Sequence, residues 1–143
     1  MATTPERAPM IERDPLDGTE TVLVVEDERP VRELIRDVLW LHGYTVLEAG
    51  DGAEAIAVAD AHSGPIHLLI VDVVMTGTAA ADVVEHVRAA RPDIRVLRVS
   101  GHPDDLLREH GVLGTDPHFL QKPFTVDALA RKVREVLDGP PGG

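Results

Sequence analysis

The chain has 143 residues, of which 43% are apolar and 27% are charged, and it contains no cysteine. This length and composition predict one globular domain, and they exclude disulfides and thiolate metal sites. The formal net charge of −11 disfavours nucleic acid as a direct partner, because a phosphate backbone demands a basic face. No apolar run approaches the roughly 18 residues of a membrane span, and no signal-peptide pattern is present, which fits a cytoplasmic protein.

The two ends of the chain carry no hydrophobic period. Proline and glycine interrupt residues 1–19, which we expect to form a disordered leader. Residues 139–143 consist of glycine and proline, and we expect a disordered tail there. The predicted domain therefore covers residues 20–138.

The first predicted strand is Val22–Val25, and an amphipathic helix follows it. Apolar residues of this helix recur at steps of three and four: Val31, Leu34, Ile35, Val38 and Leu39. Pro30 suits its first turn, and the pair His42-Gly43 ends it. We expect Trp40, near that end, to be partly buried.

A short strand at 45–47 precedes an alanine-rich helix at 53–61. The predicted core face of this helix is Ala55, Ile56 and Ala59. Residues 66–71 form a nearly continuous apolar strand, as is typical of a strand covered on both faces. A helix at 80–90 follows, with three valines inward: Val83, Val84 and Val87.

The last third of the chain repeats the alternation. It predicts a strand at 94–99, a weak helix at 102–110, a strand at 118–121 and a final helix. Thr125 is the predicted N-cap of that helix. Its predicted core face is Val126, Leu129, Val133, Val136 and Leu137.

Strands that alternate with helices in this way predict an α/β fold with a parallel sheet and helices on both faces. Ligands of such sheets bind beyond the carboxyl ends of the strands. Five polar residues follow the apolar runs at that position: Glu26, Asp27, Asp72, Ser100 and Lys122. We therefore expect three carboxylates, a hydroxyl and an ammonium group to meet at one edge of the sheet.

Carboxylates gathered at one edge repel each other, and a pair 4 Å apart costs about 4 kcal/mol at an effective dielectric near 20. A divalent cation removes that cost, and oxygen ligands favour Mg²⁺. Asp27 and Asp72 are the candidate direct ligands, and Glu26 is expected to act through a water molecule. The alternative is that Glu26 and Asp27 only stabilise the start of the following helix.

Asp72 is the candidate nucleophile, because a carboxylate can attack phosphorus and form an acyl phosphate. Lys122 and the cation would neutralise the phosphoryl oxygens, and the Ser100 hydroxyl would donate to one of them. Taken singly, Ser100 is also an ordinary turn residue and Lys122 an ordinary solvated side chain. Lys122 precedes Pro123, and a cis bond there would aim the lysine over the sheet edge.

Four stretches of this chain together resemble the receiver domain of two-component signalling. They are VLVVEDE (22–28), LLIVDVVM (68–75), RVLRVSGH (95–102) and FLQKPF (119–124). GYTVLEAGDGAEAIA (43–57) is similar to the same family, and the resemblance covers about residues 21–138. The sequence of these stretches is most similar to that of the receiver attached to hybrid histidine kinases.

The resemblance implies a flavodoxin-like (βα)5 three-layer sandwich with a five-stranded parallel sheet of order 2-1-3-4-5. It implies that Asp72 is the phosphoacceptor and that Glu26, Asp27 and the backbone carbonyl of Val74 serve the metal. It gives Ser100 and Phe119 the roles of switch residues and Lys122 that of a phosphoryl-binding residue.

The implied function is that of a phosphoacceptor in a phosphorelay. A histidine kinase or a histidine phosphotransfer protein would donate the phosphoryl group, with Mg²⁺ as cofactor and Mn²⁺ as a second candidate. The domain would catalyse only its own phosphorylation and dephosphorylation. Its output would be the binding of an unidentified protein, or homodimerisation through the face made by the fourth helix, fifth strand and fifth helix.

Departures from the family pattern lie after the nucleophile. The family often has proline where this chain has Thr76, and glycine where it has Ala80, so we expect a different loop path or an earlier third helix. Val74 is apolar and cannot orient a water molecule, which predicts slow autodephosphorylation. His102 is the other flanking residue, either to orient water or as a plain loop residue.

Two alternatives remain open at this stage. One is a phosphohydrolase that resembles the haloacid dehalogenases, although Val74 occupies the position of their acid. The other is a pseudo-receiver that binds partners without being phosphorylated. The seven histidines are scattered over different elements, which disfavours a zinc site.

Overall fold

The computed structural model describes residues 15–75, 77–101 and 118–139. Its strands are β1 (Thr21–Val25), β2 (Thr45–Ala49), β3 (Leu68–Asp72), β4 (Arg95–Ser100) and β5 (Phe119–Gln121). Its helices are α1 (Arg29–Leu41), α2 (Gly52–Ala61), α3 (Ala80–Ala90) and α5 (Val126–Asp138). The predicted helix at 102–110, leader residues 1–14 and tail residues 140–143 lie outside the described part of the chain.

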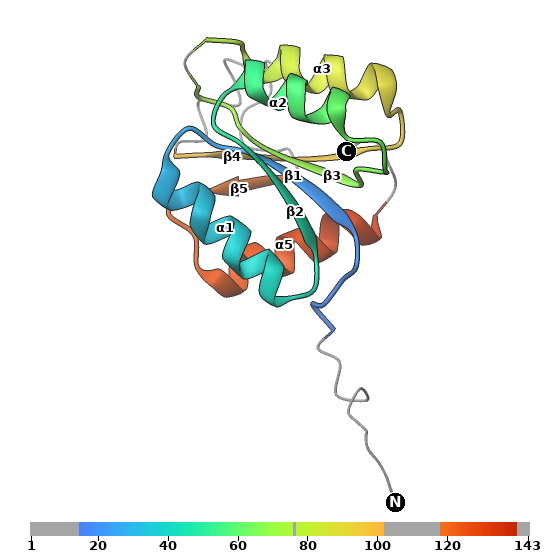
Figure 1. Ribbon diagram of the computed structural model, residues 1–143. Helices are drawn as coiled ribbons and strands as arrows, with labels where there is room; N and C mark the ends of the chain where they lie inside the picture. Colours follow the sequence, from blue (N-terminus) through green and yellow to red (C-terminus); the bar gives the residue numbers. More distant parts are fainter. Residues whose placement is uncertain (1–14, 76, 102–117, 140–143) are drawn as a thin grey trace, which may run out of the picture.

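The strands form one parallel sheet in the order β2-β1-β3-β4-β5. Helices α1 and α5 cover one face of this sheet, and α2 and α3 cover the other (Figure 1). The predicted flavodoxin-like three-layer architecture and its strand order are therefore confirmed.

Alternate residues of the central strands supply two apolar clusters, because successive side chains of a strand point to opposite faces. On β1, Val22 and Val24 belong to the cluster under α1 and α5, whereas Leu23 and Val25 belong to the cluster under α2 and α3. All five residues of β3 are buried, as expected for a central strand covered on both faces. The two clusters cover both faces of the sheet behind its carboxyl edge.

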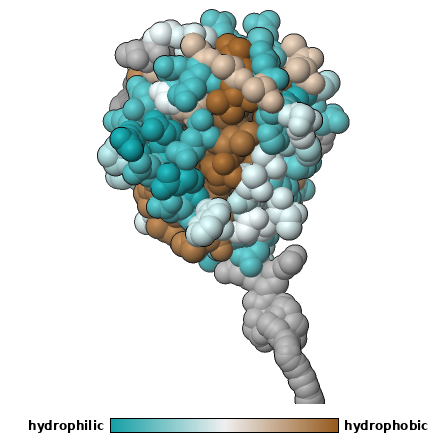
Figure 2. Space-filling view, in the orientation of Figure 1, coloured by the Kyte–Doolittle hydropathy of each residue, from teal (hydrophilic) through white to brown (hydrophobic). Residues whose placement is uncertain are grey.

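Strand β2 is an edge strand with a mixed environment. Val46 packs against the α1/α5 cluster and Leu47 against the α2/α3 cluster, and both stay partly exposed. Figure 2 shows an apolar band over this edge, bordered by polar surface on α1. No helix in the described ranges is long and apolar enough to cross a membrane.

Four apolar helix residues are more exposed than the sequence predicted. Leu34 is 41% exposed, Trp40 70% and Val126 50%, and Ile56 is only partly buried. Each residue turns the helix by about 100°, so Trp40 leaves the face that Leu39 presents to the core. Val126 lies in the first turn of α5, where the side chain has not yet reached the sheet.

The starts of two helices agree with the sequence. The Thr125 side chain accepts a hydrogen bond from the Ala128 N–H at 3.0 Å, which confirms the predicted cap of α5. Helix α3 begins at Ala80, which is 2% exposed. The positive φ of the preceding loop falls on Gly77, at 83°, so Ala80 carries no strain from a left-handed backbone.

The described end of the predicted leader contacts the domain. Leu16 packs against the α1/α5 cluster, and the Gly18 N–H donates to the His42 carbonyl at 3.0 Å. A guanidinium of α5, that of Arg134, donates to the Asp17 carbonyl at 3.2 Å. A side chain at Gly18 would collide with Tyr44, Glu20 and Arg134. Residues from Leu16 onward are therefore part of the packed domain.

Candidate functional site

The predicted site residues converge at the carboxyl edge of the sheet. Glu26 and Asp27 directly follow β1, while Asp72 and Ser100 are the last residues of β3 and β4. Lys122 directly follows β5. Register brings them level, because Val25 pairs with Val71, Asp72 with Val99, and Ser100 with Gln121.

Three carboxylates form one acidic group at this edge. One oxygen each of Glu26, Asp27 and Asp72 lies within 4.8 Å of the others. Glu26 is 1% exposed and Asp72 4%, whereas Asp27 is exposed. Two buried acids and one exposed acid leave the group open on the solvent side, which a small ion needs for entry.

The Lys122 ammonium lies among three carboxylates. Its Nζ donates to Asp72 Oδ2 at 3.0 Å and to Glu28 Oε1 at 3.1 Å. It also lies 2.9 Å from Glu26 Oε1, without the alignment of a hydrogen bond. Burial alone would lower the pKa of Lys122, but the attraction of Glu26 and Asp72 outweighs it and raises the pKa above its usual value. Lys122 is therefore a permanent positive charge at the edge.

Glu26 is the acid of this group whose pKa is raised. Burial raises the pKa of Glu26 to about 7, and the charge of Asp72 adds to the rise, while Lys122 and the Glu28 N–H oppose it. Glu26 Oε2 accepts that N–H at 3.1 Å, but the fully buried Oε1 accepts no hydrogen bond from any described residue. A carboxylate oxygen left in this state lacks the partner that a cation or its water would supply. The donor set thus fits a hard divalent cation.

Asp72 presents its carboxylate in a fixed orientation. Its Oδ1 accepts the backbone N–H of Val74 at 2.9 Å, and its Oδ2 accepts Lys122. The side chain of Val74 is 53% exposed beside it. A buried carboxylate held at both oxygens is preorganised for attack on an incoming group.

The remaining predicted residues have these places. Ser100 is fully buried at the end of β4, and its carbonyl accepts the Lys122 N–H at 2.7 Å. Phe119 begins β5 and packs, partly buried, against the α2/α3 cluster. The Lys122–Pro123 peptide bond is cis. Thr76 and His102 lie outside the described residues.

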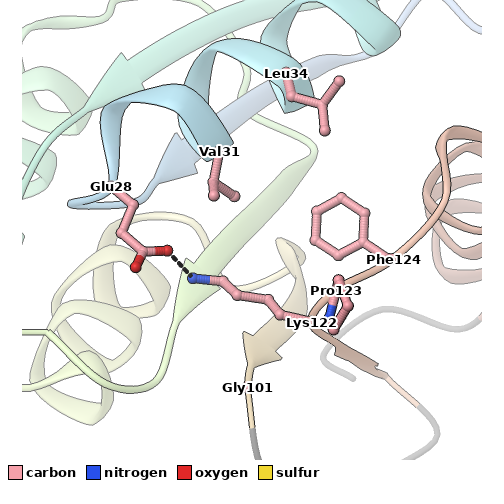
Figure 3. A pocket seen from close by; sticks show the side chains of 7 residues that line it. All are labelled: Glu28, Val31, Leu34, Gly101, Lys122, Pro123 and Phe124. Atoms are coloured by element: carbon pink, nitrogen blue, oxygen red, sulfur yellow. Dashed lines mark hydrogen bonds and ion pairs between the residues drawn. The ribbon is translucent and has the colours of Figure 1, made fainter.

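A pocket of about 440 Å³ adjoins the acidic group (Figure 3). Its lining residues are Glu28, Val31, Leu34, Gly101, Lys122, Pro123 and Phe124. Leu34 is partly exposed because it lines this pocket. The contact between Glu28 and Lys122 was not predicted from the sequence. The only signal was its position as the third acid of the run 26–28, and nothing local relates it to Lys122.

Comparison with known proteins agrees with this geometry. The family model of the response regulator receiver domain matches residues 22–134. The chain therefore belongs to the response regulator receiver domain family of two-component signalling. Receiver domains are generally signalling modules and not enzymes.

Particular relatives make the match more specific. Sensor kinase CckA of Brucella abortus is 36% identical over 123 residues, which are 86% of this chain and 13% of that kinase. The crystal structure of the receiver domain from hybrid histidine kinase CckA is 37% identical with a TM-score of 0.67, covering 82% of this chain and 98% of that one. The chain thus spans only a small part of the kinase that it resembles.

A third relative was solved with ligands. The response regulator TrrA of Thermotoga maritima, in complex with Mg²⁺-BeF, is 27% identical with a TM-score of 0.66. The match covers 82% of this chain and 98% of that one.

Proposed function

We propose that this domain accepts a phosphoryl group on Asp72 from a phosphohistidine of a histidine kinase or histidine phosphotransfer protein. The observation that carries the proposal is the contact of Lys122 Nζ with Asp72 Oδ2 at 3.0 Å, beside an acidic group that fits a divalent cation. Nucleophile, permanent cation and metal acids share one edge, as phosphoryl transfer to a carboxylate requires.

In the proposed transfer, a carboxylate oxygen of Asp72 attacks phosphorus and forms a P–O bond. The P–N bond of the phosphohistidine breaks, and the imidazole nitrogen keeps the electron pair. The Val74 N–H and Lys122 hold the carboxylate during this step. Lys122 then stabilises the negative oxygens of the phosphoryl group, and the Ser100 hydroxyl donates to one of them.

Residues that would hold the metal are Asp27, Asp72 and the backbone carbonyl of Val74, with Glu26 acting through water. Mg²⁺, or Mn²⁺ in its place, would offset the carboxylate charges and those of the phosphoryl oxygens. Glu26 Oε1, which is buried and accepts no hydrogen bond from the described residues, supports this assignment.

The signalling step is a population shift between two surface conformations. Ser100 and Phe119 are the switch residues in this scheme, and Phe119 is only partly buried, which leaves room for another rotamer. The output would be protein binding, with homodimerisation through the fourth helix, β5 and α5 as one form. A cytoplasmic location follows from such a phosphorelay role.

The proposal is tested by incubating the protein with Mg²⁺ and acetyl phosphate and measuring its intact mass. We expect a gain of one phosphoryl group that base hydrolysis removes and that peptide mapping assigns to Asp72. Asp72→Asn should abolish the gain, and Asp60→Asn, on the exposed surface of α2, should leave it unchanged. No adduct in the native protein would favour the pseudo-receiver, whereas turnover of a generic phosphate ester would favour the phosphohydrolase.

A further inference from the structure

Glu28 stands at the start of α1, yet its side chain does not serve that helix. It is the N-cap residue of α1, with an extended backbone, and no side-chain cap hydrogen bond is present. The short side chains of Ser, Thr, Asp and Asn accept a backbone N–H of the first turn from this position. Glu28 instead accepts the Lys122 ammonium at 3.1 Å, across 94 positions of sequence. Its carboxylate is therefore committed to the phosphorylation site.

Three carboxylates surround the Lys122 ammonium in this state. An ammonium group has three N–H donors. Two are used by Asp72 Oδ2 and Glu28 Oε1, and Glu26 Oε1 lies within 2.9 Å of the same nitrogen. A phosphoryl oxygen that binds Lys122 therefore competes with these three carboxylates for the ammonium.

Burial decides which carboxylate leaves. The Glu26 side chain is 1% exposed and that of Asp72 is 5%. Separating either carboxylate from Lys122 would leave a buried charge without its partner, which is costly. The Glu28 side chain is 61% exposed, so its carboxylate returns to water when it is released. Glu28 is the partner that costs least to lose.

The surroundings of the pair are consistent with such an exchange. Figure 3 shows Glu28 and Lys122 reaching toward each other across one side of the pocket, from the start of α1 and the end of β5. The backbone of Glu28 is held independently, because its N–H donates to Glu26 Oε2 at 3.1 Å. Release of the side chain therefore leaves the acidic group in place.

We propose that Glu28 is a positioning residue that holds Lys122 in the resting protein and yields it to the incoming phosphoryl group. This inference rests on the proposed function, since it names the group that competes with phosphate for Lys122. Glu28 thereby raises the concentration of phosphodonor that the domain needs for a response.

The test compares the native protein with Glu28→Gln, Glu28→Asp and Glu33→Gln. Glu28→Gln removes the charge, and Glu28→Asp keeps the charge but is one methylene shorter. Glu33→Gln is the matched control, because Glu33 lies on α1, is 40% exposed and pairs with Arg29 on the same helix. Calorimetry measures the dissociation constant of beryllofluoride in the presence of Mg²⁺.

We expect both Glu28 variants to bind beryllofluoride at least about threefold more tightly, and Glu33→Gln to match the native protein. If Glu28→Gln alone binds more tightly, a general charge effect explains the result and the proposal is overturned. If the native protein binds and no variant differs, Glu28 has no such role, although the proposed function stands. If the native protein does not bind, the proposed function itself fails.

A second measurement observes Lys122 without any ligand. The chain has only two lysines, Lys122 and Lys132, so protein labelled with ¹⁵N at the lysine side chains gives two ammonium signals. We expect hydrogen exchange at Lys122 to become faster in both Glu28 variants, while Lys132, which pairs with Glu135, stays unchanged. Unchanged exchange at Lys122 would contradict a holding contact.

Discussion

The ammonium of Lys122 contacts three carboxylates that differ in their access to water. Two are buried beside it, and Glu28 is largely exposed. The positive charge of Lys122 is therefore balanced by two buried carboxylates and by one exposed carboxylate, which water can solvate when it is released. Because Asp72 is one of the buried partners, a change at Lys122 alters the charge directly beside Asp72.

Val74 is the residue that we expect to set the lifetime of the phosphorylated state. Its N–H orients Asp72, and its side chain is 53% exposed and apolar, so it cannot align a water molecule. Val74→Gln retains the N–H and adds an amide that can orient water. We expect loss of phosphate to become several-fold faster, measured by the decay of the phosphorylated mass after the donor is removed.

Val74→Leu is the control for that change, because it retains an apolar side chain at the same exposed position. Its phosphate lifetime should match that of the native protein. Equal decay in Val74→Gln and Val74→Leu would show that this position does not govern access of water.

At the scale of single elements, the helices differ in how their first turns are capped. Helices α2 and α5 have side-chain caps from Asp51 and Thr125. Helix α1 has no side-chain cap and has proline in its first turn. Because α1 has no side-chain cap, the Glu28 side chain is left to contact Lys122.

Thr125→Ala tests the cap of α5. The change removes the oxygen that accepts the Ala128 N–H at 3.0 Å, and we expect the free energy of unfolding to fall by about 1 kcal/mol. Chemical denaturation measures the change. Val126→Ala, at the next position and 50% exposed, should cost clearly less, and an equal cost would indicate that packing and not capping is lost.

At the scale of the whole molecule, Arg134 joins the beginning of the domain to its end. Its guanidinium donates to Glu20 Oε2 at 2.7 Å, to the Tyr44 hydroxyl at 3.1 Å and to Asp138 Oδ1 at 2.9 Å. The hydrogen bond from Arg134 lowers the pKa of Glu20 below its usual value of 4.5. The ionised carboxylate therefore stabilises the folded state.

Glu20→Gln tests this link through its pH dependence. Because the folded-state pKa is lowered, the contribution of Glu20 is present above the usual value of 4.5 and is lost as the pH falls through the lower folded value. We expect the variant to lose about 1 kcal/mol of unfolding free energy at neutral pH and to match the native protein in strong acid.

Glu135→Gln is the control, since Glu135 is 62% exposed and lies 3.5 Å from Lys132. It should change the free energy of unfolding little at any pH. A loss for Glu20→Gln that persists unchanged in acid would contradict an ionic contribution.

The sequence alone predicted the alternation of the described strands and helices along the chain. It also predicted that five polar residues meet at one edge of the sheet. Apolar runs of the central strands and the periods of the helices are local patterns, and a parallel sheet brings its carboxyl ends together whatever the side chains are. Residues such as Asp72 and Lys122 were therefore found from their place after an apolar run.

Only the tertiary structure decided which helical residues face water and which acid contacts Lys122. Leu34 and Val126 share the apolar period of their buried neighbours and are nevertheless exposed, because periodicity contains no information on where a helix leaves the sheet. The contact between Glu28 and Lys122 joins positions 94 residues apart, and it exists because β1 and β5 end at one edge while α1 begins beside them. Contacts of this kind depend on the packing of segments distant in sequence, which no local pattern records.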